Sequence, residues 1–247
     1  MPIKYLVPAS IVVLSASVAE AQYATPQPFV ADEPIDSYLD LAPRNAFEIG
    51  VQGGYMQPFG ELERNTNIND VTDPGGEAAL ELNWRISPRY AFGGTARFHE
   101  SVVDARLGEG FDVRGGSANL QGTVHLAPFS LIDPYITFGA GYRVFALVPE
   151  GPTDATIRHG FEFARAQLGF DVRVSRDVAL GPNAGVSGNV FLWEDSPGTT
   201  GNQTIDDPRP SAFVFAGLTG RFDMGGTRVS EGVYYGRYPR AKTVANR

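Results

Sequence analysis

Apolar and polar side chains alternate along most of the chain, and residues 134–145 show this pattern clearly. In PYITFGAGYRVF, one row holds Ile136, Phe138 and Tyr142, while the opposite row holds two glycines and Arg143. Successive side chains of a strand point to opposite faces, so a period of two predicts a β-strand. The pattern predicts eight strands, near residues 45–57, 76–86, 90–99, 112–126, 134–145, 160–173, 178–192 and 211–222.

The gaps between these strands alternate in length. Three gaps are short turns, at residues 87–89, 127–133 and 175–177. The other gaps, at 58–75, 100–111, 146–159 and 193–210, are longer and charged. In an up-and-down antiparallel meander, this alternation places all the long loops at one rim, which is typical of bacterial outer-membrane barrels.

The polar rows carry long charged side chains of both signs. On a soluble protein such rows would form an ordinary solvated face. They also hold most of the glycines, as expected where eight strands share a narrow interior, and the fourth strand shows a parity slip at Gly115 and Gly116 that predicts a bulge. We therefore place the polar rows inside and predict a lumen ion-pair network of Glu48, Glu77, Glu81, Arg85, Arg97, Arg143, Arg165, Asp171, Arg173 and Arg221.

The apolar rows carry bulky aromatic residues toward their ends. Aromatic side chains gather at the boundaries of a bilayer, so these residues predict a girdle, made of Trp84, Tyr90, Phe92, Tyr142 and Phe222. The predicted fold is all-β, an eight-stranded antiparallel up-and-down transmembrane β-barrel. A soluble, secreted lipocalin-like barrel is the alternative, and it requires the reverse, with the aromatics around an internal cavity and the arginines in water.

The run Pro134-Tyr135-Ile136-Thr137-Phe138-Gly139-Ala140-Gly141-Tyr142 resembles the P-Y-x-x-x-G-x-G-Y strand of small outer-membrane barrels of the outer membrane protein A type. The Gln167-Leu168-Gly169 segment before the 175–177 turn is similar to the next hairpin of that superfamily. The resemblance covers residues 45–222 and implies eight antiparallel strands, a polar plugged lumen and no single inherited activity. Many members end on a terminal aromatic residue, whereas here residues 223–247 follow Phe222.

The segments on either side of the barrel differ from it in composition. Residues 1–21 combine an early Lys4, an apolar run and an A-x-A arrangement at Ala19 and Ala21, which predicts a cleaved secretory signal peptide. Residues 22–44 are rich in proline and acidic residues and are predicted to be a periplasmic linker. Residues 223–247 form a basic tail with several tyrosines, predicted to be periplasmic; a disordered extension is the alternative.

Composition and residue spacing exclude several kinds of chemistry. The net charge of -8 and the lack of a basic stripe argue against nucleic-acid binding, and the absence of cysteine removes thiolate and Cys-based metal chemistry. The histidines His99, His125 and His159 lie far apart in sequence, and no serine stands beside one at a spacing typical of a nucleophile and its base. We therefore expect no catalytic activity, no cofactor and no metal site.

The sequence leaves the role of the barrel between structure and interaction. We expect a monomer in the cell outer membrane that contacts lipid and lipopolysaccharide and uses its long acidic loops for structural or surface interactions, with an extracellular or periplasmic protein as a possible partner. A narrow channel for ions or small solutes is the other alternative, because the lumen charges would serve as a gate. Against it, the interiors of eight-stranded barrels are generally filled.

Overall fold

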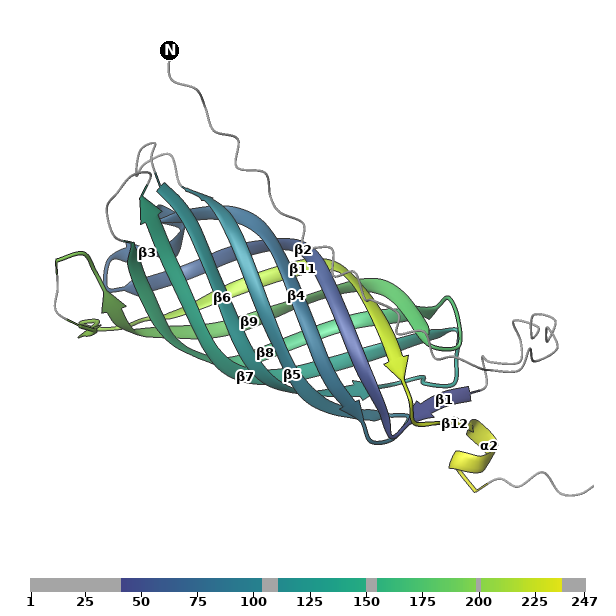
Figure 1. The fold of residues 1–247 in the computed structure, drawn as a ribbon. Helices are drawn as coiled ribbons and strands as arrows, with labels where there is room; N and C mark the ends of the chain where they lie inside the picture. Colours follow the sequence, from purple (N-terminus) through teal and green to yellow (C-terminus); the bar gives the residue numbers. More distant parts are fainter. Residues whose placement is uncertain (1–40, 104–110, 150–154, 199–200, 237–247) are drawn as a thin grey trace, which may run out of the picture. The chain divides into compact units, whose positions relative to one another are not determined.

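The computed structural model of the chain describes residues 41–103, 111–149, 155–198 and 201–236. The described residues contain eight long strands that curve around a common interior (Figure 1). These strands are β2 (Ala46–Glu63), β4 (Thr72–Arg85), β5 (Tyr90–Val103), β6 (Phe111–His125), β7 (Ile132–Pro149), β8 (Thr156–Arg173), β9 (Val178–Asp195) and β11 (Pro210–Met224). The shorter elements are β1 (Leu41–Arg44), β3 (Thr66–Asn67), η1 (Ile68–Asp70), β10 (Gln203–Thr204), β12 (Thr227–Ser230) and α2 (Glu231–Tyr234).

The eight long strands close into a barrel. Each pairs with its neighbour in the chain in antiparallel fashion, and β11 returns to pair with β2 along its whole length. This last pairing, from Ser211 opposite Gly60 to Met224 opposite Phe47, removes both free edges of the sheet. The predicted fold class, an eight-stranded antiparallel up-and-down β-barrel, is confirmed.

The strands extend further into the long gaps than the sequence pattern indicated. β2 continues to Glu63, β7 continues to Pro149, and β8 begins at Thr156. β3 and η1 lie in the first long gap and β10 lies in the last. The tight turns between β4 and β5, β6 and β7, and β8 and β9 are at the end predicted for them. We call this the turn end and the opposite one the loop end.

The bulge expected at Gly115 and Gly116 is wrong. β6 pairs with β5 and β7 without a shift of register there. The apparent slip arises because the inward row becomes apolar at Val113, which is buried on the same row as Ser117 and Asn119. The bulge occurs instead in β8, where one extra residue lies between Glu162 and Arg165. A bulge leaves two successive residues opposite one, so the inward row of β8 changes parity at this point.

The chain leaves the barrel at the turn end through two paired segments. β1 and β12 form a two-stranded antiparallel sheet, with Leu41 opposite Ser230 and Arg44 opposite Thr227. Asn45 before β2 and Gly225 and Gly226 after β11 adopt positive φ angles, which turn both segments out of the barrel wall at the same level. The expected linker and tail therefore contain strands that the sequence reading did not assign.

The tail is held to the turns by side-chain contacts. Arg89 of the β4–β5 turn donates from Nε to the Tyr235 hydroxyl at 3.0 Å, and this hydrogen bond raises the pKa of Arg89 above its usual value. The ring of Phe129, in the β6–β7 turn, packs against those of Tyr234 and Tyr235. Arg228 forms an ion pair with Asp177 of the β8–β9 turn. The described part of the tail is therefore an ordered layer on the turn end.

The predicted signal peptide (1–21), linker residues 22–40 and tail residues 237–247 lie outside the described residues. So do the acidic loop residues Asp104, Glu109, Glu150 and Asp154. In the part of the chain that the structure describes, no helix has the length and apolar character needed to cross a membrane.

Candidate functional site

The interior of the barrel is the candidate functional site, because it gathers most of the buried charges of the described residues. At the turn end, six strands each contribute one ionisable side chain to a group that we call the turn-end cluster. Its members are Glu48 (β2), Arg85 (β4), His125 (β6), Asp133 (β7), Asp171 (β8) and Arg221 (β11), all buried.

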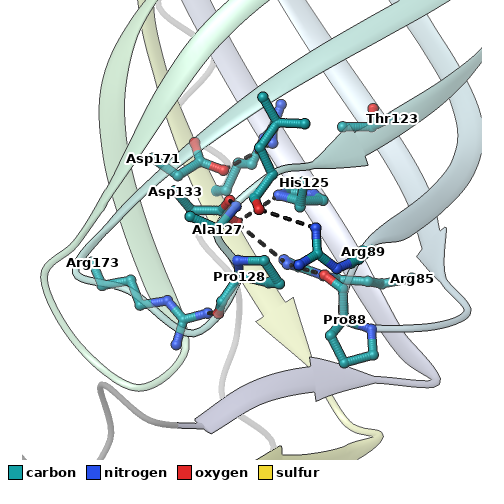
Figure 2. A network of polar contacts seen from close by, with 12 residues as sticks. Arg85, Pro88, Arg89, Thr123, His125, Ala127, Pro128, Asp133, Asp171 and Arg173 are labelled. Carbon is teal, nitrogen blue, oxygen red and sulfur yellow. Dashed lines mark hydrogen bonds and ion pairs between the residues drawn. The ribbon is translucent and has the colours of Figure 1, made fainter. Parts of the chain in front are cut away.

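Arg85 links the cluster to the neighbouring turn. Its Nη1 lies 3.5 Å from Glu48 Oε2 and its Nη2 lies 3.6 Å from Asp133 Oδ2. The same Nη2 donates to the backbone carbonyl of Pro88 at 2.8 Å (Figure 2). One guanidinium thus connects two carboxylates with the β4–β5 turn, which fixes its orientation.

Arg221 is the second centre of the cluster. Its Nη1 donates to Asp171 Oδ2 at 2.9 Å, and its other nitrogens lie 3.6 Å from Glu81 and 3.9 Å from Glu48. The guanidinium lies over the ring of Tyr135, 3.8 Å from its centroid. Three carboxylates and an aromatic face therefore surround one cation, which balances charges that could not be buried alone.

His125 lies between two carboxylates. Its Nδ1 is 2.8 Å from Asp133 Oδ2 (Figure 2). Its Nε2 is 3.7 Å from Glu48 Oε2. Asp133 also accepts a hydrogen bond from the backbone N–H of Ala127 at 2.9 Å, so it fastens the β6–β7 turn to the cluster. A nucleophile–base pair needs a hydroxyl or thiol on the histidine, and His125 has carboxylates beside both ring nitrogens. The geometry is that of a structural contact.

The middle of the lumen is organised around Phe215. The guanidinium groups of Arg97 and Arg165 lie over this ring, each 4.5 Å from its centroid. Arg97 forms an ion pair with Glu77 and donates to Gln52 Oε1 at 2.9 Å. Arg165 is 2% exposed and donates to the Gln167 side chain, but among the described residues no carboxylate lies within 4.0 Å of it.

A third arginine stands closer to the loop end. Arg143 donates to Glu162 Oε2 from Nη2 at 2.8 Å and from Nε at 3.2 Å, and it lies 4.2 Å from the centroid of Phe213. Asn119 also donates to Glu162, at 3.3 Å. Glu162 faces inward because of the β8 bulge, and it supplies the charge that Arg143 needs.

The loop end of the lumen is filled by apolar side chains. Phe145, Phe191 and Phe213 are fully buried there, and the ring centroids of the first two lie 6.0 Å apart. They belong to one cluster, the loop-end plug, which contains Met56, Leu62, Ile68, Val71, Val113, Phe145, Phe191, Ile205 and Phe213. Ile68 comes from η1 and Ile205 from the β9–β11 connection, so segments outside the long strands close this end.

The structure brings together nine of the ten residues predicted for the lumen network, each with a polar or charged partner inside the barrel. Arg173 lines the same small cavity as the turn-end cluster, but it donates to the backbone carbonyls of Leu41 and Pro128. Sequence reasoning left out His125, Asp133 and Glu162. Asp133 lies just before Pro134 and was assigned to a turn, while the bulge concealed the inward direction of Glu162.

The predicted girdle residues all lie on the outer face of the wall. Trp84, Tyr90, Phe92 and Phe222 are exposed near the turn end, where Trp84 is paired with Phe92 across β4 and β5. Tyr142 lies toward the loop end. There Tyr142 makes an edge contact with Phe161, whose ring also contacts Trp193, and sequence reasoning missed Trp193.

The outer wall is apolar and the inner wall is polar over most of the barrel. Exposed side chains include Leu80, Leu120, Phe138, Leu168 and Leu218. Each has a polar strand neighbour buried inside the barrel, namely Glu81, Asn119, Thr137, Gln167 and Thr219. Together with strand closure and tight turns at one end, this arrangement decides the fold. The described strands form a closed eight-stranded antiparallel barrel with an apolar outer wall, which is the arrangement typical of small outer-membrane barrels. A lipocalin-like barrel requires the opposite orientation of the two rows.

Solved outer-membrane barrels are similar to the chain in structure. Neisserial surface protein A is 13% identical, with a TM-score of 0.45 over 70% of this chain and 95% of that protein. The outer membrane protein OprG from Pseudomonas aeruginosa is 13% identical, with a TM-score of 0.44 over 73% of this chain and 98% of that protein. The outer membrane protein AlkL, solved in DMPC lipid bilayers, is 13% identical, with a TM-score of 0.44 over 77% and 95%. Neither a protein-family model nor a curated protein matches the chain.

Proposed function

We propose that the protein is a monomeric, non-enzymatic integral barrel of the cell outer membrane, exported through a cleaved signal peptide, with a structural and surface-interaction role. The main observation that supports this proposal is the contrast between an apolar outer wall and a filled interior. An exposed apolar surface of this extent is unstable in water and is suited to lipid. In this reading, lipid and lipopolysaccharide are the first partners of the barrel.

The filled interior supports a structural role over conduction. The turn-end cluster pairs its charges internally, and the members of the loop-end plug are apolar side chains, which cannot replace the hydration shell of an ion. An ion that crosses this barrel must displace both groups of side chains. We therefore interpret the lumen charges as internal cross-links of the wall.

The loop end is the proposed surface for a protein partner. Its described acids are partly neutralised: Arg158 lies 3.3 Å from Glu63 and 2.6 Å from Glu194, and Arg64 lies 2.7 Å from Asp207. Arg158 thus links the loop ends of β2 and β9 to β8, and the Arg64–Asp207 pair joins the first long connection to the last. The described parts of the first and last loops thus carry less free negative charge than the sequence suggested, and loops on a rigid scaffold commonly carry recognition.

Membrane fractionation with gel migration tests the location. We expect the protein in the detergent-soluble membrane fraction, and we expect folded and boiled samples to migrate differently because the closed barrel resists unfolding until it is heated. Recovery in the soluble periplasm without detergent would contradict the proposal.

Planar-bilayer recording tests the filled lumen. We expect no discrete conductance steps above leak for the folded protein. As a positive control, a variant with three plug substitutions, Phe145→Ala, Phe191→Ala and Phe213→Ala, should increase the leak. Steps in the unmodified protein would replace the structural role with that of a channel.

A further inference from the structure

The outer wall from β4 to β8 contains an apolar groove of about 960 Å³. Its floor is made of small side chains that are direct cross-strand neighbours, Ala96 of β5 and Ala118 of β6, with Ala140 of β7 beside them. Leu80 of β4 stands on one side and Phe161 of β8 on the other. The groove lies within the apolar outer wall and is continuous with the surface proposed above to face lipid.

The β8 bulge builds one side of the groove. Phe163 and Ala164 are both exposed, although the residues before and after them, Glu162 and Arg165, are buried. Because of the extra outward residue, this part of the outer wall carries Phe163 in addition to Phe161. The Phe163 ring lies over Gly188 of β9, since a Cβ at that glycine would come within 2.6 Å of it. The ring thus leans toward β9, and Phe163 lines the β8 side of the groove together with Phe161.

Toward the loops, the groove ends at polar and aromatic side chains. Tyr142 lines the groove, and its hydroxyl is hydrogen-bonded to His159 Nδ1. His159 is stacked on Trp193, with ring centroids 5.6 Å apart. Farther toward the loops, Arg114 of β6 lies 3.4 Å from its cross-strand neighbour Glu100 of β5 on the outer face. Aromatic and then charged side chains mark the change from hydrocarbon to water, so the groove runs from the apolar interior of the membrane to its surface.

We infer that the groove holds one acyl chain of a lipid from the leaflet at the loop end, with the polar head of that lipid at Tyr142 and His159. This inference rests on the proposed function, because it takes the outer wall as lipid-facing. An apolar groove with a hydrogen-bonding end has the polarity of an amphiphile. Leu120 is 79% exposed and stands between Gly94 and Ala140, so a flexible chain follows the surface around it better than the rigid wall of a second copy.

Native mass spectrometry with dimyristoylphosphatidylethanolamine tests the inference. Ala118→Phe fills the groove floor, whereas Ala184→Phe puts the same side chain on the exposed outer face of β9. We expect the unmodified protein and Ala184→Phe to retain one lipid per barrel. Ala118→Phe should bind it about tenfold more weakly, the ratio expected when about two methylene groups lose their contact. If Ala118→Phe does not fold, Ala96→Leu is the milder variant.

Equal retention by all three proteins, or retention by none, overturns the inference. A dimer that Ala118→Phe disrupts overturns it too, because a second copy then occupies the groove. Heat-modifiable migration of each protein separates this result from the proposed function. Barrels that insert into membranes but show no groove-dependent retention refute the acyl-chain site alone.

Discussion

The two halves of the lumen are filled in different ways. At the turn end, Arg85 and Arg221 are surrounded by carboxylates at 2.9 to 3.9 Å, and the interior is a network of charges. At the loop end, Phe145, Phe191 and their neighbours pack as an apolar cluster. One barrel therefore combines an interior held by electrostatics with one held by burial.

The difference follows from what surrounds each half. At the level of the turn-end cluster, the outer wall is apolar, and polar residues have only the interior in which to lie. Toward the loops, the outer face carries Glu100 and Arg114, and the interior can be apolar as in a soluble protein. We expect the charged half to demand exact chemistry and the apolar half to tolerate changes that keep its volume.

Replacing Arg221 is expected to have the largest effect. Arg221→Met leaves Glu81 and Asp171 buried without their shared cation, and breaking a buried pair in this way costs about 3–5 kcal/mol. Urea unfolding of the barrel in lipid vesicles measures the loss of unfolding free energy. Arg176→Met, at an exposed arginine of the β8–β9 turn, is the control and should change it by less than about 0.5 kcal/mol. Equal losses for the two variants would remove the distinction between cluster and surface.

Opening the plug is expected to cost slightly less. Phe191→Ala removes a fully buried ring that packs against Phe145, with a loss of about 3 kcal/mol in the same assay. Phe191→Leu keeps most of the volume and should cost less than about 1.5 kcal/mol. The corresponding conservative change in the charged half, Arg221→Lys, should cost more than Phe191→Leu because lysine lacks the planar fork of donors. The opposite order would show that both halves are held by packing alone.

Overfilling the plug should have an intermediate effect. A Cβ at Gly115 would come within 2.4 Å of the His99 ring, which lies between Phe145 and Phe213. Gly115→Ala should therefore cost about 1–3 kcal/mol of unfolding free energy. Gly76→Ala is the control, because a Cβ at that position meets nothing within 4 Å. A loss no larger than that of the control would indicate a soft loop end.

Much of the fold was predictable because one rule, apolar outward and polar inward, holds along most strands. Even the aromatic residues Phe213 and Phe215 keep a period of two with the polar inward residues Thr219 and Arg221, and all four are buried. The rule fails toward the loop end, where the inward residues are apolar. Along β2, the inward residues change from Glu48 and Gln52 to Met56 and Leu62. The sequence of the loop-end part of the strand therefore has the pattern of a loop.

The candidate site was predictable only where parity is continuous. With a strict period of two along β8, Glu162 falls on the outward row, although Arg143 of β7 points inward. The bulge that turns Glu162 toward Arg143 depends on backbone register. Within residues 157–163 taken alone, the alternation puts Phe161 and Phe163 on the apolar row and Glu162 on the polar row. The plug was not predictable, since Ile68 and Ile205 come from connections that have no strand pattern.

The smallest expected effect concerns the tail, which lies outside both halves. Tyr235→Phe removes the hydroxyl that accepts from Arg89 but keeps the ring against Phe129, so the loss should stay below about 1 kcal/mol at this exposed site. Proteolysis of the folded barrel is the more sensitive measurement, because release of α2 exposes the backbone after β12. We expect faster cleavage of the tail in Tyr235→Phe with an unchanged urea midpoint. Tyr55→Phe, on the outer face of β2, is the control. A lower urea midpoint for Tyr235→Phe would show that the tail also supports the turn-end cluster.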